Sequence, residues 1–285
     1  VQRGMQQGLS ILRPTAPARP PAIPAGAAVV LDVHTSEVLA MVSEPSYDAN
    51  VFERGSADAV SALFTDPAHP LLDRTYMEVH APGSIFKPLV ALAALENRVI
   101  APETTIYAGG SLQVRNQYDP SVVYTFGDWA VHGNVNMNRA LARSSDVYFY
   151  EVAGGVWEGG RETFRGLGAD RLAQWARFAG LGRPTGLDLP GEASGLVPDS
   201  AWKQRALGED WLLGDTYTFG IGQGYLTASV MQMATMTAAL ANGGDLLVPH
   251  VVRGVQQHGA LTLVPTRVTA RLRSEEHTSE LPSRG

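Results

Sequence analysis

Ser84-Ile85-Phe86-Lys87 places a serine and a lysine three residues apart, at the start of a predicted helix. Positions i and i+3 lie on one face of a helix, so we expect Lys87 to reach the Ser84 hydroxyl. A serine alone is a poor nucleophile near neutral pH, and a desolvated, neutral lysine beside it can take its proton. The chain has only one other lysine, Lys203, against twenty arginines, so a chance lysine here is less expected than in a typical sequence. Alone, this short pattern still favours an ordinary helix with a capping serine and a surface lysine.

The residues around this pattern predict a helix with one buried stripe. Pro82 and Gly83 suit a helix start, and the helix is expected to end near Asn97. Ser84 and Lys87 lie off the stripe, on a neighbouring face. The stripe follows the i, i+3, i+4 spacing and consists of Phe86, Leu89, Val90, Ala93 and Ala94.

Length and composition set the broad class of protein. The chain has 285 residues, enough for one large domain or one and a half ordinary ones. A net charge of −6 argues against a general nucleic-acid binder, and the absence of cysteine excludes disulfides and thiolate metal sites. No run approaches the roughly 18 apolar residues of a membrane span. Because the chain begins at Val1, we expect a fragment whose targeting segment is missing.

On the amino-terminal side the sequence predicts a helix end, a linker and a hairpin. From residue 43 to about residue 82 we expect a polar loop, with Tyr47 and Phe52 as apolar anchors. The polar helix end, the stiff proline-rich linker and the β-hairpin are assigned to residues 1–12, 14–24 and 28–42.

On the carboxyl-terminal side the sequence predicts helices separated by short turns. Ser229 and Gln232 fit a capping box that opens an apolar helix through Leu240. Trp175 and Phe178, at helical spacing, are predicted to lie in the core. The other expected elements are a short helix to Arg143, a helix from Val147, a helix capped by Asp170 that ends at Gly180, a tight turn at residues 220–224 and a strand at residues 248–252 that starts a hairpin.

The last residues differ in character from the rest of the chain. Residues 273–285 are polar and break the strand pattern that precedes them. They are typical of a translated sequencing adaptor rather than of a folded segment, so we assign them as a non-native tail.

Ser144-Ser145-Asp146 forms a second polar cluster, between two predicted helices and 60 residues after Ser84. Acyl transfer by a Ser/Lys pair needs a further hydroxyl to pass the proton to the leaving amine, and a polar group to hold the substrate amide. Ser144 and Asp146 are the right residue types for these two tasks. Alone, the cluster favours a simpler role as a helix N-cap.

Together, the two clusters resemble the active-site motifs of the penicillin-binding transpeptidases. Residues 82–88, Pro-Gly-Ser-Ile-Phe-Lys-Pro, resemble the first motif. Residues 144–150, which begin Ser-Ser-Asp, resemble the second motif in a form often found in the elongation-type branch, penicillin-binding protein 2. The likeness runs in order and spacing from about Ala27 to about Arg253. It also includes Leu31-Asp32-Val33, residues 37–43, Pro45-Ser46-Tyr47-Asp48, residues 220–225, Gln232 and Ala241-Asn242-Gly243-Gly244.

The resemblance implies a fold and a reaction. The fold is α+β of the β-lactamase/transpeptidase type, an antiparallel sheet flanked by helices with an all-helical subdomain. The reaction is a D,D-transpeptidation through a serine acyl-enzyme, which cross-links peptidoglycan stem peptides during cell elongation and cell-shape maintenance. β-Lactams mimic the D-Ala-D-Ala donor and inhibit such enzymes covalently.

The resemblance also implies a role for each residue of the two motifs. Ser84 is the nucleophile and Lys87 its general base, and the Ser84 backbone N–H supplies half of an oxyanion hole. Ser144 relays protons. Asp146 orients Lys87 and the substrate amide, so that Ser84 and Asp146 both bind substrate. No cofactor, metal ion or nucleic acid is implied.

Location and partners follow from the same resemblance. The family is anchored in the cell inner membrane with its catalytic domain in the periplasm, and the elongation branch works beside membrane proteins of the elongation complex. We expect the anchor to lie outside this chain.

The sequence departs from the family in its third motif. No Lys-Thr/Ser-Gly sequence is present, and Lys203, followed by Gln204-Arg205, cannot serve. The strand that carries this motif normally supplies the second oxyanion N–H, and losing one such donor costs roughly 10²–10³ in rate. We therefore expect a chain that is inactive or nearly so. The expected domains are a pedestal and linker remnant at residues 1–26, a transpeptidase domain at residues 27–272 that is truncated between Val264 and Arg273 and lacks the C-terminal strands and last helix, and the tail at residues 273–285.

Two other functions stay open from the sequence. A serine D,D-carboxypeptidase or a β-lactamase would use the same fold, but no glutamate can be assigned to activate the water that either needs. A non-catalytic scaffold of the elongation machinery fits the absent third motif and conflicts with the intact Ser/Lys pair.

Two weaker motifs are given structural roles. The glycines of residues 220–224 lack the preceding strand and the lysine or ribose carboxylate of a nucleotide loop, so we expect a tight turn beside the active site. Asp128 and His132 lie four residues apart without further His or Cys nearby, which predicts a structural or surface role rather than a metal site.

Overall fold

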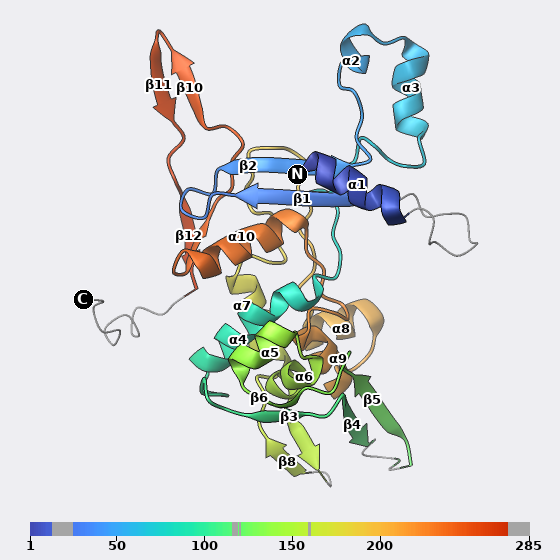
Figure 1. The fold of residues 1–285 in the computed structure, drawn as a ribbon, viewed down its shortest axis with the longest axis vertical. Coiled ribbons are helices and arrows are strands. Elements are labelled where there is room, and N and C mark those ends of the chain that lie inside the picture. Colours follow the sequence, from blue (N-terminus) through green and yellow to red (C-terminus); the bar gives the residue numbers. More distant parts are fainter. Residues whose placement is uncertain (13–24, 116–118, 120, 159–160, 273–285) are drawn as a thin grey trace. The chain divides into compact units, whose positions relative to one another are not determined.

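The computed structural model describes residues 1–12, 25–115, 119, 121–158 and 161–272, and these form two compact units (Figure 1). Unit 1 consists of Val1–Val79, Arg183–Ser194 and the chain from Ala228 onward. Unit 2 consists of His80–Gly182 and Gly195–Thr227, so it contains every predicted site residue. The predicted linker at residues 14–24 and the predicted tail at residues 273–285 lie outside the described residues.

Unit 1 is built on the predicted hairpin. Strands β1 (Gly26–Leu31) and β2 (Val38–Glu44) pair antiparallel, with Gly26 opposite Glu44 and a bulge at the end of β1. Helix α1 (Gln2–Leu12), which confirms the predicted polar helix end, reaches the hairpin through its glutamines. The side-chain amides of Gln2 and Gln6 donate to Glu44 Oε1 at 3.0 and 2.9 Å.

Helix α10 (Val230–Ala241) begins with the predicted capping box and lies against β1 (Figure 1). Ser229 Oγ accepts from Gln232 N at 3.1 Å, and Gln232 Oε1 accepts from Ser229 N at 2.8 Å. The amide nitrogen of Gln232 also donates to the carbonyls of Arg183 and Ser194. One side chain therefore starts the helix and holds both ends of the 183–194 segment. The core of this unit contains Tyr76, Leu187 and Met231, with Val29, Leu31, Val38 and Met41 packed against them.

The predicted polar loop contains two short helices that the sequence pattern did not indicate. Helices α2 (Val51–Arg54) and α3 (Ala57–Thr65) have no buried residue, so they leave no apolar stripe to detect. Tyr47 and Phe52 are not anchors. They are 41% and 50% exposed and pack edge to face on each other, with ring centroids 5.9 Å apart.

The predicted strand at residues 248–252 is wrong. Strand β9 (Asp245–Leu247) ends before it and pairs with β12 (Val268–Arg271), while the hairpin that follows consists of β10 (Gly254–Gln257) and β11 (Ala260–Leu263). The backbone N–H groups of Val251 and Val252 donate to the carboxylate of Asp188, at 2.8 and 3.0 Å. A side chain thus satisfies the donors that a strand partner would have used.

Unit 2 is mainly helical, with short antiparallel strand pairs at its periphery (Figure 1). Its helices pack on one another through apolar faces that contain Leu89, Phe149 and Leu172, all buried. The helical elements are η2 (Gly83–Phe86), α4 (Lys87–Glu96), α5 (Met137–Arg143), α6 (Asp146–Gly154), α7 (Ala169–Phe178), α8 (Ser200–Leu207) and α9 (Leu213–Gly220). The strand pairs are β3 (Ile106–Ala108) with β6 (Gly133–Val135), β4 (Ser111–Arg115) with β5 (Val123–Gly127), and β7 (Val156–Glu158) with β8 (Arg161–Phe164).

Helices α6 and α9 approach closely because glycines lie at their contact. A Cβ atom at Gly154 would overlap the ring of Tyr217, and one at Gly220 would overlap Ala153. Tyr217 is fully buried, and its hydroxyl donates to the carbonyl of Gly155 at 3.0 Å. This contact fixes the end of α9, from which the predicted tight turn at residues 220–224 continues.

Helix α7 confirms the predicted helix but corrects two details. The N-cap is Gly168, and Asp170 lies inside the first turn. There its carboxylate interacts favourably with the helix dipole but does not cap the helix. Phe178 is 44% exposed and packs edge to face on Trp175, at 6.0 Å between ring centroids. The pair is therefore a surface contact and not part of the core.

None of the helices in the described ranges is long and apolar enough to cross a membrane.

Burial makes Glu151 on α6 a pH-dependent group of unit 2. Desolvation raises the pKa of Glu151 from 4.5 to about 7. Between these values the folded state binds more protons than the unfolded state, so the free energy of unfolding falls as pH rises. We expect Glu151→Gln to remove this fall: its melting temperature should exceed that of the parent near pH 8, and the two should converge below about pH 4.5. Thermal unfolding of both proteins between about pH 4 and pH 8 measures these melting temperatures. A parent protein that melts at a higher temperature than the variant near pH 8 would contradict the prediction.

Candidate active site

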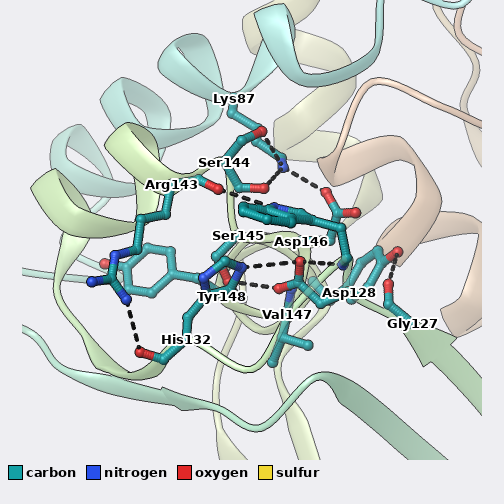
Figure 2. A network of polar contacts seen from close by, with 12 residues as sticks. Lys87, Gly127, Asp128, His132, Arg143, Ser144, Ser145, Asp146, Val147 and Tyr148 are labelled. Carbon is teal, nitrogen blue, oxygen red and sulfur yellow. Dashed lines mark hydrogen bonds and ion pairs between the residues drawn. The ribbon is translucent and has the colours of Figure 1, made fainter.

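Lys87 is the centre of a polar cluster inside unit 2 (Figure 2). Its side chain is 1% exposed, and its Nζ donates to Ser144 O at 2.8 Å, to Ser144 Oγ at 3.2 Å and to Asp146 Oδ1 at 2.5 Å. The ring of Phe149 lies 5.7 Å from the same nitrogen. Three oxygen atoms therefore lie within hydrogen-bonding distance of this one buried nitrogen.

The turn between α5 and α6 brings Ser144 and Asp146 to the lysine. Ser144 ends α5 in the left-handed region, at φ 52° and ψ 41°, and Ser145 then caps α6 by accepting from Tyr148 N. The sequence offered an N-cap or a catalytic role for this cluster, and the structure separates the two. Ser145 is the cap, while its two neighbours face Lys87.

Ser84 lies one turn before Lys87, in the short helical turn η2 that leads into α4. It is exposed, in contrast to the buried lysine. The predicted contact between the two side chains is not formed, because the hydrogen bonds of Lys87 Nζ go to the α5–α6 turn and none goes to Ser84. The stripe predicted for this helix is buried as expected.

The turn at residues 220–224 holds the backbone just before Ser84. Gly83 N donates to Gly222 O at 2.8 Å, and Gly83 and Gly222 both have positive φ, at 63° and 74°. A Cβ at Gly222 would overlap the carbonyl oxygen of Gly83. Ring stacking of Phe86 on Phe219, with centroids 5.8 Å apart, supports the same approach. The sequence predicted a tight turn beside this site, but not that Gly83 is its backbone partner.

Lys203 has a different environment and a structural role. It is 2% exposed and forms ion pairs with Asp215 at 2.7 Å and Glu209 at 3.5 Å. Burial alone would lower the pKa of Lys203, but the hydrogen bond and charge of Asp215 raise it above its ordinary value. Lys203 therefore stays protonated and ties α8 to the start of α9.

Asp128 is the residue near this site whose role the sequence did not reveal. It lies between β5 and β6, and its buried carboxylate faces the start of α6 (Figure 2). Its only sequence signal was its spacing of four from His132, which the structure realises as a 3.3 Å contact between Asp128 Oδ1 and His132 Nε2. Among the described residues, no group of three or more His, Asp or Glu side chains is arranged to hold a metal ion.

Comparison with known proteins places this arrangement in a family. The Penicillin binding protein transpeptidase domain matches residues 26–281. The peptidoglycan D,D-transpeptidase MrdA of Haemophilus influenzae is 39% identical over 234 residues, which are 81% of this chain and 34% of that protein. The chain thus spans about a third of the length of this curated relative.

Solved structures show the same likeness in three dimensions. Penicillin-binding protein 2 from Helicobacter pylori aligns with a TM-score of 0.73 and 32% identity, over 87% of this chain and 43% of that one. The complex of that protein with MreC aligns with a TM-score of 0.72 and 32% identity, over 88% of this chain and 42% of the matched one. The predicted fold class, α+β of the β-lactamase/transpeptidase type, is confirmed. Because the family match includes both motifs and most of the chain, the chain belongs to the family of penicillin-binding protein transpeptidase domains.

Proposed function

We propose that this chain is part of a peptidoglycan D,D-transpeptidase of the elongation type, and that it reacts through a serine acyl-enzyme. One observation supports this most directly: a fully buried lysine is held by Ser144 and Asp146 one helical turn after an exposed serine. A purely structural lysine needs a carboxylate partner, as Lys203 has, but it does not need an exposed serine at the start of its own helix.

The proposed reaction has two halves that share one covalent intermediate. Ser84 Oγ attacks the carbonyl between the two terminal D-alanines of a stem peptide, and its proton passes to a neutral Lys87. The Ser84 backbone N–H stabilises the oxyanion that forms. Collapse of the tetrahedral intermediate breaks the peptide bond, and the departing amine takes a proton relayed through Ser144 Oγ. Terminal D-alanine leaves and an ester on Ser84 remains.

The second half forms the cross-link. The amino group of a neighbouring stem peptide attacks the ester carbonyl and loses a proton to the same relay. Ser84 then departs as the alcohol, regaining its proton from Lys87. For either half, Lys87 has to exchange one contact in the α5–α6 turn for Ser84, and the short distances to Ser144 Oγ and Asp146 Oδ1 give it a route for the proton.

Location and partners are part of this proposal. The relative from Helicobacter pylori has been solved in complex with MreC, and another similar structure is that of a peptidoglycan synthase complex that coordinates polymerization and crosslinking. We infer that the parent of this chain works with such membrane elongation proteins, with its catalytic domain in the periplasm of a cell whose inner membrane carries the anchor.

The test is where a β-lactam attaches. Trypsin does not cleave before proline, so residues 75–98 form one peptide that spans Lys87-Pro88 and contains Ser84 as its only serine. We expect a penicillin adduct on this peptide, found by mass spectrometry after incubation for hours, because without a Lys-Thr/Ser-Gly motif acylation should be slowed by about 10²–10³. An adduct on any other peptide, or none, would contradict the proposal.

The lifetime of the adduct separates the related reactions. A long-lived adduct supports a transpeptidase, whereas rapid release of hydrolysed penicillin would indicate a β-lactamase. With a D-Ala-D-Ala peptide and a D-amino acid acceptor, exchange of the last residue supports transpeptidation, and release of D-alanine alone would indicate a carboxypeptidase.

A further inference from the structure

Asp128 has a fully buried side chain, which accepts hydrogen bonds from Trp129, Ser145 and Val147 and contacts His132. Its Oδ1 accepts from Trp129 N at 2.8 Å and lies 3.3 Å from His132 Nε2. Its Oδ2 accepts from Ser145 Oγ at 2.8 Å and from Val147 N at 3.0 Å (Figure 2). Because both oxygens are filled by protein donors, this carboxylate is committed to the fold and not to a metal ion.

The two donors on Oδ2 flank Asp146. Ser145 precedes it and Val147 follows it, so one carboxylate oxygen holds the chain on both sides of the residue that pairs with Lys87. A buried carboxylate beside the first turn of α6 also interacts favourably with the dipole of that helix. Burial alone would raise the pKa of Asp128, but hydrogen bonds from Val147, Ser145, Asp146 and Trp129 lower it below its ordinary value. The group is therefore ionised, and ionised acceptors make the stronger hydrogen bonds.

The loop of residues 128–132 also holds the chain before the α5–α6 turn, on the Arg143 side. The indole N–H of Trp129 donates to Arg143 O at 3.1 Å, and Arg143 Nη1 donates to His132 O at 3.3 Å. Arg143 is the residue before Ser144. Residues 128–132 therefore bind the chain on either side of the segment that faces Lys87, and Asp128 is the part of this loop that reaches α6.

We propose that Asp128 is a positioning residue, which holds the Ser144–Asp146 turn in the geometry that Lys87 requires. Asp128 does not touch Lys87, and it acts only through the backbone and the Ser145 hydroxyl. Its consequence for acylation rests on the function proposed above, whereas its effect on the environment of Lys87 does not.

The chain offers a direct readout, because it contains two lysines and both are buried in ion pairs. In protein labelled with [13Cε]lysine, two side-chain NMR signals are expected, and Lys203→Arg assigns them. Asp128→Asn keeps the size of the side chain but turns one acceptor into an amide that faces N–H and O–H donors. We expect the Lys87 signal to move while the Lys203 signal stays, and penicillin acylation to slow about 10- to 100-fold, as misplacement of a catalytic group by about 1 Å does.

The matched control is Asp188→Asn. Asp188 also holds two successive backbone N–H groups, but in unit 1. It should move neither lysine signal. An unchanged Lys87 signal in Asp128→Asn would overturn the proposal.

If Asp128→Asn unfolds the chain, both signals collapse to one position, and Ser145→Ala then decides. That variant removes the Ser145 donor from Asp128 Oδ2 together with the cap of α6, while Asp128 keeps its bonds to Trp129 and Val147. A displaced Lys87 signal beside an unmoved Lys203 signal supports the proposal, and two unmoved signals refute it. A parent chain that penicillin does not acylate would refute the proposed function and leave this NMR result unaffected.

Discussion

Lys87→Met is expected to slow acylation by penicillin by about 10²–10⁴, the range that a positioned general base contributes. Methionine keeps much of the apolar stem but has no proton acceptor strong enough to activate Ser84. It also leaves Ser144 O and Asp146 Oδ1 without their donor, which should lower the free energy of unfolding by about 1–3 kcal/mol. The rate is measured with a fluorescent penicillin in excess, with Ser84→Ala defining the background.

Lys203→Met separates the two consequences. Lys203 is buried to a similar degree and pairs with Asp215 at 2.7 Å, so its loss should destabilise the fold comparably. Its side chain touches no group of the proposed reaction, so we expect it to keep the acylation rate of the parent chain. Equal kinetic losses in the two variants would show that Lys87 acts only through stability.

Gly222→Ala is expected to displace Ser84 and so to cost both stability and rate. An alanine at φ 74° is strained by about 1–2 kcal/mol, and its Cβ would also overlap the carbonyl oxygen of Gly83. Since that carbonyl belongs to the residue before Ser84, relief of the overlap has to move Ser84, the proposed nucleophile. A displacement of about 1 Å is enough for a 10²-fold slower acylation. Thermal unfolding and acylation kinetics measure the two effects.

Gly208→Ala controls for the strain alone. Gly208 ends α8 at φ 70°, and a Cβ there would have no neighbouring atom within 4 Å. It should show the backbone cost without the kinetic loss. The prediction fails if both glycine variants acylate at the same rate.

The sequence predicted the parts of the fold that are carried by local patterns. Three of these patterns depend on residues close together in the sequence, and the structure shows all three. They are the buried stripe of the Ser84 helix, the capping box at Ser229 and the hairpin of β1 and β2. The two candidate motifs were also found from local residue types. That Ser144 and Asp146 both face Lys87 follows from the left-handed residue at the end of α5, which no spacing rule indicates.

What the sequence missed depends on partners far along the chain. At the end of the strand expected at residues 248–252, the N–H groups of Val251 and Val252 are bound by Asp188, more than 60 residues earlier. Asp128 had no visible role because its partners, Ser145 and Val147, lie beyond the next helix. Helices α2 and α3 bury no side chain and so produce no periodic signal. The Ser84–Lys87 contact was expected from helical spacing, but the hydrogen bonds of Lys87 Nζ go to Ser144 and Asp146 in the α5–α6 turn.

The glycine contacts of unit 2 restrict how this protein could evolve under selection by a covalent inhibitor. At Gly154, Gly220 and Gly222 any side chain enters space that other atoms already fill. A substitution there therefore destabilises the fold, whether or not it weakens binding of the inhibitor more than binding of the substrate. Exposed neighbours of the proposed site are free of this constraint; Ile85, next to the proposed nucleophile Ser84, is 55% exposed. Resistance should therefore accumulate at the rim of the site, while the glycines beneath it remain unchanged.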